Sequence, residues 1–487
     1  MRCSILLLAL VTIVSSTAAQ TASTEHRPLN VLFIAVDDLR PELGCYGAAH
    51  APTPNIDHLA AEGIAFRNHF VQVPTCGASR YALLTGRSPA NSGAMGNGAL
   101  YNGKTALSAK ELPGAQTLPE LFRRNGYHTT LIGKISHTAD GRVYGYDGKG
   151  DGRAELPHAW DDFATPFGDW KRGWGIFFAY ANGKHREDGQ GHRDLMEFVV
   201  EEDEDLPDGL MAQTAVQKLQ ALKSVDKPFF MGLGFFKPHL PFVAPREDWE
   251  AVAKLELPPP PHPDKPDSPY WHPSGEFFGY DFPFEVERPM SAEQVDRCRR
   301  AYLACVRYTD RQIGKVLDAL DETGLAESTV VVLWGDHGWS LGDSYLWGKH
   351  APFERAVRSP LILRAPGIGK HGVTSDALVE TIDLFPTLMD LCGPFENRET
   401  TFPLDGLSLR PILDSPNSEV REAALSYWRD AVSVRTKEHR LVWSRNRGLP
   451  GAELYDASTD FDPVKNLAQD LPEVVERLRE FVPVSHR

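Results

Sequence analysis

The chain has 487 residues, a hydrophobic content of 42% and a formal net charge of −15. This length exceeds one average domain, so we expect a large domain and a smaller one. The negative charge argues against a general nucleic-acid binder, so an anionic substrate has to be met by a local cluster of Lys, Arg and His.

The first 19 residues have the pattern of a cleaved export signal. Arg2 precedes an apolar stretch over residues 5–14, and small residues lead to Ala19. The stretch is shorter than the ~18 residues that a membrane span requires, and no other segment has the pattern of a span. We expect a signal peptide over residues 1–19 and an exported protein, either periplasmic or secreted, or in a lysosome-like lumen if the source is eukaryotic.

Four expected strands are each followed by polar side chains. Apolar runs over residues 30–36, 228–235 and 329–334 predict buried parallel strands, and residues 127–132 predict a further one. Any one polar cluster could be a solvated turn. Because the carboxyl ends of parallel strands share one edge, four clusters together favour one site. The residues are Asp37 and Asp38, Lys134 and His137, Lys237 and His239, and Asp336 and His337.

A turn and a short helix follow the first of these strands. Residues 78–84 suit a helix, and Gly86 stands where a helix-ending glycine is expected. Cys76 would then lie near the helix N-terminus, where the helix dipole favours a thiolate. Arg80 lies one turn further on and could point back at Cys76. For a lone cysteine, however, a small buried residue at a turn is the favoured interpretation.

Several helices are expected between the strands. Pro54 opens a helix that Gly63 ends, and the sequence Thr117-Leu118-Pro119-Glu120 predicts a capping box. Ser291 is expected to cap a long helix that runs to about Glu322. Further helices are expected over residues 210–222 and 383–391, and a further strand over residues 360–363.

Long loops are expected to shape the rim of the site. Residues 140–191 are rich in Gly, Asp and aromatic residues, and residues 257–269 are rich in proline. The acidic run over residues 201–205 could attract cations, although a solvated loop is favoured. Neither loop identifies a sugar from its sequence.

The cysteines do not have the spacing of a disulfide scaffold. Cys298 and Cys305 lie in one expected helix, ~10 Å apart and too far for a bridge. Cys45 and Cys392 could pair or remain free.

The C-terminal part has a different pattern. Short alternating segments over residues 425–428, 431–435, 440–443 and 453–455 predict a small antiparallel sheet, followed by a helix over residues 472–481. The fold class expected is therefore α/β: a large domain with a mostly parallel central sheet flanked by helices, plus a small α+β subdomain. We place the large domain at residues 27–415 and the subdomain at 416–487.

The clustered side chains suit a cation and an anionic group. Carboxylates favour a hard cation such as Ca²⁺ or Mg²⁺, while three histidines could instead indicate zinc. Arg80 and the lysines suit an anion with several oxygens, either sulfate or phosphate.

The sequence from Cys76 to Arg80, followed by Leu84-Thr85-Gly86-Arg87, resembles the signature of the formylglycine-dependent type I sulfatases. Ala78 stands where that family more often has Pro. The segment from Val36 to Gly47, the run Lys-Pro-His-Leu-Pro-Phe and the run Asp-His-Gly-Trp-Ser-Leu-Gly are similar to the iduronate-2-sulfatase-like branch, within the alkaline phosphatase-like superfamily. The resemblance extends from about Asn30 to the C-terminus.

The resemblance implies a chemistry and a set of roles. A maturation enzyme would oxidise Cys76 to formylglycine, whose hydrate attacks sulfur, expels the sugar alcohol and then releases sulfate. One Ca²⁺ per site is implied, held by Asp37, Asp38, Cys76, Asp336 and His337. Arg80 and Lys134 would steady the hydrate and His137 would assist its second hydroxyl. Lys237, His239 and Lys349 would grip the sulfate, and His239 would protonate the leaving alcohol. The implied substrate is a sulfated saccharide, such as a 2-O-sulfated uronate.

Two other functions remain open at this point. A phosphomonoester or phosphonate hydrolase could share the fold, but its relatives often use two metals or a Ser/Thr nucleophile. Cys76 followed by Arg80, with one metal cluster, favours sulfate. A non-catalytic glycan-binding relative is the other alternative, and it is disfavoured because every expected catalytic position is filled.

Overall fold

The computed structural model describes residues 28–369, 371–458 and 465–487. The expected signal peptide lies outside these ranges. Within them, no helix combines the length and the apolar character needed to cross a membrane.

An eight-stranded sheet forms the centre of the molecule. Five neighbouring strands, from β8 to β4, run parallel, while β11 is antiparallel to both of its neighbours. The expected mostly parallel sheet is therefore confirmed. The strand order is β12 (Val373–Glu380), β2 (Ile64–Phe70), β11 (Leu361–Arg364), β8 (Thr329–Gly335), β1 (Asn30–Val36), β6 (Phe229–Phe235), β3 (His128–Gly133) and β4 (Asp162–Phe163).

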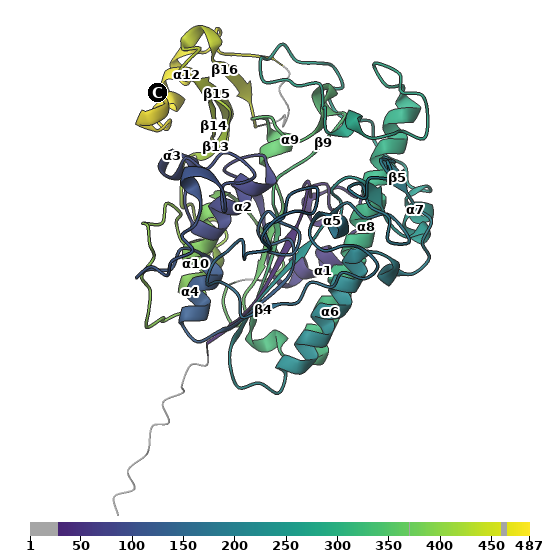
Figure 1. Ribbon diagram of the computed structural model, residues 1–487. Coiled ribbons are helices and arrows are strands. Elements are labelled where there is room, and N and C mark those ends of the chain that lie inside the picture. Colours follow the sequence, from purple (N-terminus) through teal and green to yellow (C-terminus); the bar gives the residue numbers. More distant parts are fainter. Residues whose placement is uncertain (1–27, 370, 459–464) are drawn as a thin grey trace, which may run out of the picture.

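Helices cover both faces of this sheet. Successive side chains of strand β1 point to opposite faces, and because those of residues 31–36 are all apolar, both faces have to be buried. Leu32, Ile34 and Val36 belong to one core, and Val31 and Phe33 belong to the other. Figure 1 shows α6 and α8 on one side of the sheet and α4 and α10 on the other. The first layer contains α1 (Pro54–Glu62), α6 (Pro207–Leu222) and α8 (Ala292–Glu322); the second contains α2 (Cys76–Thr85), α4 (Leu118–Arg124) and α10 (Leu384–Cys392).

Two helix starts test the capping predictions. Ser291 caps α8 by accepting a hydrogen bond from the Gln294 amide, as expected. The capping box at Thr117 was wrong, because the Thr117 side chain makes no capping hydrogen bond. Glu120 accepts instead from the amide of Gln116 at 2.8 Å.

The C-terminal sheet is antiparallel, as the alternating pattern predicted. It lies beside the N-terminal end of α2 (Figure 1). Ser426 donates to the Val71 carbonyl at 2.6 Å, and the Tyr427 amide donates to the Gln72 carbonyl at 2.7 Å. This sheet therefore supports the turn that leads to Cys76. Its elements are β13 (Ala424–Trp428), β14 (Ala431–Arg435), β15 (His439–Ser444), β16 (Glu453–Asp456) and α12 (Pro472–Arg479). The boundary between residues 415 and 416 stays a prediction.

Short elements join these parts. They are α3 (Pro89–Ser92), α5 (Trp174–Phe177), α7 (Arg246–Val252), α9 (Glu354–Val357), α11 (Arg410–Asp414), β5 (Met196–Glu197), β7 (Phe242–Val243), β9 (Ser340–Leu341) and β10 (Trp347–Gly348). Cys298 and Cys305 are free in α8, as expected, and Cys45 and Cys392 are also free.

Candidate active site

The four polar clusters meet at one edge of the sheet. Strands β8, β1, β6 and β3 are adjacent and parallel, so their carboxyl ends lie side by side. The side chains of the clusters are nearly inaccessible to solvent, at 4% exposure or less. The prediction that separate strand ends build one site is therefore consistent with the packing of the sheet.

Four of the five expected metal ligands converge. The ligand atoms of Asp37, Cys76, Asp336 and His337 all lie within 4.8 Å of one another. His337 has its Nδ1 3.0 Å from the Gly338 carbonyl, so Nδ1–H donates there and Nε2 offers its lone pair to the group. The Cys76 Sγ lies 3.3 Å from that Nε2.

Asp38, the fifth expected ligand, lies at the side of this group. Its Oδ1 is 3.3 Å from His337 Nε2 and 2.9 Å from Lys349 Nζ. Its backbone has a φ of 60°, and its amide donates to the Asp336 carboxylate at 3.0 Å. A non-glycine residue held in the left-handed region is strained and is often found at functional sites.

The donor set fits a hard divalent cation. Three buried carboxylates provide the oxygen ligands that Ca²⁺ and Mg²⁺ prefer. Arg80, Lys134 and Lys349 balance part of their charge through ion pairs with Asp37, Asp38 and Asp336.

Arg80 points into the carboxylate group rather than back along its own helix. Its side chain contacts Asp336 at 3.0 Å and Asp37 at 3.2 Å. Lys134 Nζ also contacts Asp37, at 2.6 Å. Burial alone would raise the pKa of Asp37, but the positive charges of Lys134, His239 and Arg80 hold that pKa well below its ordinary value.

Cys76 is a buried residue and not an activated thiol, as the favoured interpretation of a lone cysteine predicted. It is the first residue of α2 and is 3% exposed. Burial and the negative charge of Asp37 raise the pKa of the thiol to about 12, although Lys134 and Lys349 oppose this. The effect of burial outweighs the helix N-terminus, so an unmodified Cys76 would be a poor nucleophile at neutral pH.

The two histidines expected to move protons are buried and flanked by aromatic rings. The ring of His137 lies 5.2 Å from that of Trp174, and the ring of His239 lies 4.6 Å from that of Phe177. Burial lowers the pKa of both histidines well below the ordinary value, with Lys134 adding to the effect at His137 and Lys349 at His239. His239 Nδ1 donates to the Leu240 carbonyl at 2.7 Å, which leaves Nε2 facing the site.

Two other cationic side chains are held in structural contacts. Lys237 Nζ donates to the Pro241 carbonyl at 2.6 Å and to the His239 carbonyl at 3.3 Å, so it braces the turn that carries His239. Arg40 is buried against Asp343, at 2.7 Å. Arg40 therefore forms a structural ion pair.

The structure adds residues that no motif indicated. Glu276 lies 3.5 Å from His239 Nε2 and 3.8 Å from Lys349 Nζ. The Tyr146 ring packs at 4.6 Å, tilted, against Trp174, the ring that contacts His137. Both residues lie in irregular segments without periodicity; aromatic enrichment in residues 140–191 was the only signal for Tyr146, and the sequence held none for Glu276.

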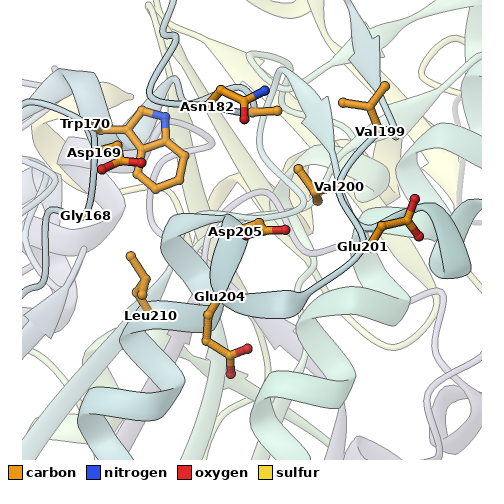
Figure 2. Close-up of a pocket in the computed structure, with 11 residues that line it drawn as sticks. Gly168, Asp169, Trp170, Asn182, Val199, Val200, Glu201, Glu204, Asp205 and Leu210 are labelled. Atoms are coloured by element: carbon orange, nitrogen blue, oxygen red, sulfur yellow. The ribbon is translucent and has the colours of Figure 1, made fainter.

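A separate acidic pocket lies away from this site. It has a volume of about 420 Å³ and is lined by residues that include Asp169, Glu201, Glu204 and Asp205. Figure 2 shows the carboxylates of Glu201 and Glu204 pointing in different directions. Glu201 pairs with Arg246 at 2.8 Å and Glu204 with Lys315 at 3.1 Å. These two carboxylates therefore do not converge in the pocket. Asp203, from the same acidic run, is not solvated as expected: it is buried close to Glu247 and Asp248, and Arg311 pairs with Asp203 and Asp248.

Comparisons with known proteins agree with the geometry. The Sulfatase family model matches residues 29–394. The chain is 31% identical to iduronate 2-sulfatase of Homo sapiens over 412 residues, covering 76% of this chain and 70% of that protein. It is 33% identical to a sulfatase of Formosa agariphila over 381 residues, covering 75% and 69%. The phosphonate monoester hydrolase of Agrobacterium radiobacter has a similar fold, with a TM-score of 0.72, 21% identity and coverage of 93% and 94%. The chain belongs to the sulfatase family, whose members are sulfuric ester hydrolases.

Proposed function

We propose that this protein hydrolyses a sulfate ester on a sugar, with formylglycine formed from Cys76 as nucleophile and Ca²⁺ as the bound cation. The observation that carries the proposal is the position of Cys76. Its sulfur lies beside His337 at 3.3 Å and Lys349 at 3.4 Å, and it shares a group of close ligand atoms with Asp37 and Asp336. Position 76 is thus placed between a cation site and groups that attract an anion.

Asp37, Asp38, Asp336 and His337 would hold the cation together with the side chain at position 76. When bound, Ca²⁺ and converted Cys76 supply an acidified hydroxyl nucleophile and neutralise charge on the sulfate. Arg80 and Lys134 keep Asp37 ionised through their ion pairs, and Arg80 also holds Asp336 in place.

Lys349 and His239 would act on the substrate side. Lys349 Nζ lies within hydrogen-bond reach of both the Cys76 sulfur and Asp38, where a sulfate oxygen could replace one contact. His239 presents Nε2 to the site and would donate the proton that the leaving alcohol needs, once the negative charge of a bound sulfate has opposed the burial that lowers its pKa. His137 is held neutral by its lowered pKa, so it can accept a proton from the nucleophile. Lys237 was expected to grip the sulfate. In addition to that role, it would hold His239 in position through its hydrogen bonds to the His239 and Pro241 carbonyls.

The substrate proposed is a 2-O-sulfated uronate or a related polysaccharide unit. Support comes from the relative that is named iduronate 2-sulfatase and is 31% identical to this chain. We further propose an exported protein that meets a formylglycine-generating or equivalent maturation enzyme, on the basis of residues 1–19 and Cys76.

Two measurements test the proposal. Mass spectrometry of the peptide that contains Cys76, from protein made in its native host, is expected to show an aldehyde or its hydrate in place of the thiol. An unmodified thiol in active protein would contradict the mechanism, and a thiol in inactive protein would support the glycan-binding alternative. A panel of defined sulfated saccharides then identifies the sugar and the sulfate position.

A phosphonate or phosphomonoester hydrolase is the second candidate, because the Agrobacterium radiobacter enzyme shares the fold. Among the described residues, the strand-end group has one set of converging carboxylates for a cation. A matched aryl sulfate and aryl phosphate are expected to differ in kcat/KM in favour of the sulfate. A higher value for the phosphate would overturn the assignment.

A further inference from the structure

Two irregular segments lie next to the strand-end groups: one within residues 140–191, which carries Tyr146 and Arg186, and one that carries Glu276. We call these two segments the loop wall. Tyr146 is 49% exposed, although its ring packs at 4.6 Å on Trp174. Trp174 in turn lies 5.2 Å from His137 and 5.9 Å from Phe178. An exposed ring that is fixed from below can stack on the apolar face of a pyranose.

The Tyr146 phenol is close enough to the site to respond to its charges. Burial raises the pKa of this phenol, and the charges of Lys134, Cys76, Arg186 and Glu276 also act on it. Lys134 and Cys76 belong to the cation group, whereas Arg186 and Glu276 belong to loops. Tyr146 therefore lies between the groups assigned to the reaction and the loop wall.

Arg186 is a positive charge held in a fixed orientation on this wall. Its guanidinium lies 3.3 Å from the centre of the Phe178 ring. Nη1 donates to the Tyr280 hydroxyl at 2.9 Å, and Nε donates to Glu187 at 2.8 Å. Within the described part of the chain, Nη2 makes no hydrogen bond. A guanidinium fixed in this way can receive a carboxylate with little loss of side-chain entropy.

Glu276 supplies an acceptor on the other side. Its carboxylate lies 3.5 Å from His239 Nε2 and 3.8 Å from Lys349 Nζ, and the side chain is 32% exposed. It is thus next to the histidine assigned to the leaving alcohol, where a sugar hydroxyl adjacent to the sulfated carbon would lie. A carboxylate there can accept a hydrogen bond from that hydroxyl.

We propose that Tyr146, Arg186 and Glu276 form a subsite for an acidic pyranose, on the leaving-group side of the sulfate. Tyr146 stacks on the ring, Arg186 pairs with the ring carboxylate, and Glu276 accepts from a neighbouring hydroxyl. This subsite rests on the proposed function, because it selects among sulfated sugars rather than performing the hydrolysis.

The test compares three substrates on matched variants. The substrates are methyl 2-O-sulfo-iduronoside, the same sugar with its carboxylate reduced to an alcohol, and a simple aryl sulfate. Arg186→Gln is expected to lower kcat/KM for the uronate at least about tenfold more than for the aryl sulfate, the size of one charged hydrogen bond. Reducing the carboxylate should cause a similar loss in the unmodified protein and little further loss in the variant.

Arg172→Gln provides the control, since Arg172 lies in the same loop, is about half exposed and contacts Asp140 at 3.9 Å and the Phe167 ring at 4.6 Å, away from Tyr146 and Glu276. It should leave all three substrates unaffected. Arg186→Lys keeps the charge and should recover part of the loss, which separates recognition from a folding defect. Glu276→Gln is expected to reduce uronate turnover by a smaller factor, because the amide oxygen still accepts a hydrogen bond.

Equal losses on the uronate and the aryl sulfate in Arg186→Gln would overturn the subsite, as would equal turnover of the uronate and its reduced form by the unmodified protein. If no sulfate ester is hydrolysed at all, the proposed function has failed, and binding decides the subsite alone. Calorimetric titration with methyl iduronoside should then show binding that Arg186→Gln weakens; absence of binding to the unmodified protein would refute the proposal.

Discussion

The two halves of the site are built in different ways. The cation half comes from the ends of buried strands, and its central residues Asp37, Arg80 and Asp336 are 0% exposed. The loop wall comes from irregular segments, and its residues Tyr146 and Glu276 are 49% and 32% exposed. The difference indicates that the sheet determines which reaction is possible, while the loops determine which substrate is accepted.

Removing the side chain at position 76 is the strongest test of the cation half. Cys76→Ala is expected to lower kcat for any sulfate ester by at least about 10⁴-fold, because the nucleophile is lost. Aryl sulfate turnover measures this loss. Cys45→Ala is the control and should retain activity, because Cys45 lies in the segment that follows β1 and is not a member of the ligand group. Full activity in Cys76→Ala would contradict the assigned role.

Substituting an arginine in each half compares their contribution to stability. Arg80→Ala removes the arginine partner of buried Asp336 and leaves Lys134 as the remaining ion-pair partner of Asp37, so we expect the free energy of unfolding to fall by about 3–5 kcal/mol. Arg186→Ala, on the half-open wall, should cost about 1 kcal/mol or less. Urea denaturation measures both values. Equal losses would show that the two halves do not differ as described.

His239 lies between the two halves, near Asp38 of the cation half and Glu276 of the loop wall, so a variant there tests how they work together. His239→Ala should keep the fold and cation binding but slow the release of a sugar alcohol by about 10²–10⁴-fold, the usual contribution of a general acid. An aryl sulfate with a good leaving group should lose much less. Undiminished release of the sugar alcohol would refute the role of His239.

Stabilisation by a bound cation should depend on residues of the cation half and not on residues of the loop wall. At a free Ca²⁺ concentration of 100 times its Kd, the free energy of unfolding should rise by about 2.7 kcal/mol, and a chelator should reverse the change. Asp336→Asn should abolish this increase, whereas Glu276→Gln on the wall should retain it. A larger effect of Zn²⁺ than of Ca²⁺ would favour the histidine-based zinc site that the sequence left open.

The same contrast explains how far the sequence could be interpreted. Strands β1, β6 and β8 carry continuous apolar runs, so both their existence and their shared edge could be predicted. Strands β2 and β12 were not predicted, because they mix polar and apolar residues, as in Arg67-Asn68-His69, without regular alternation. Packing against neighbouring strands, rather than local pattern, places them in the sheet.

Side-chain directions were harder to predict than positions. Arg80 was expected near Cys76, but it contacts Asp37 and Asp336 because unpaired buried carboxylates are costly. Burial was the favoured expectation for Cys76, but one helix start could not show how far burial outweighs the helix dipole in setting the pKa of the thiol. Arg186 and Glu276 both lie close to Tyr280, although they come from segments far apart in the chain. Residue spacing in the sequence cannot predict this proximity.

The support that the C-terminal sheet gives to the turn before Cys76 also sets an order of events. His337, which contacts the Cys76 sulfur, lies 261 positions further along the chain, and the strands that brace residues 71 and 72 are later still. Once those segments have closed, a 3% exposed side chain is out of reach of another enzyme's catalytic groups. On the proposed mechanism, oxidation of Cys76 therefore has to be finished before these segments fold, and protein folded without it is expected to stay inert until it is unfolded again.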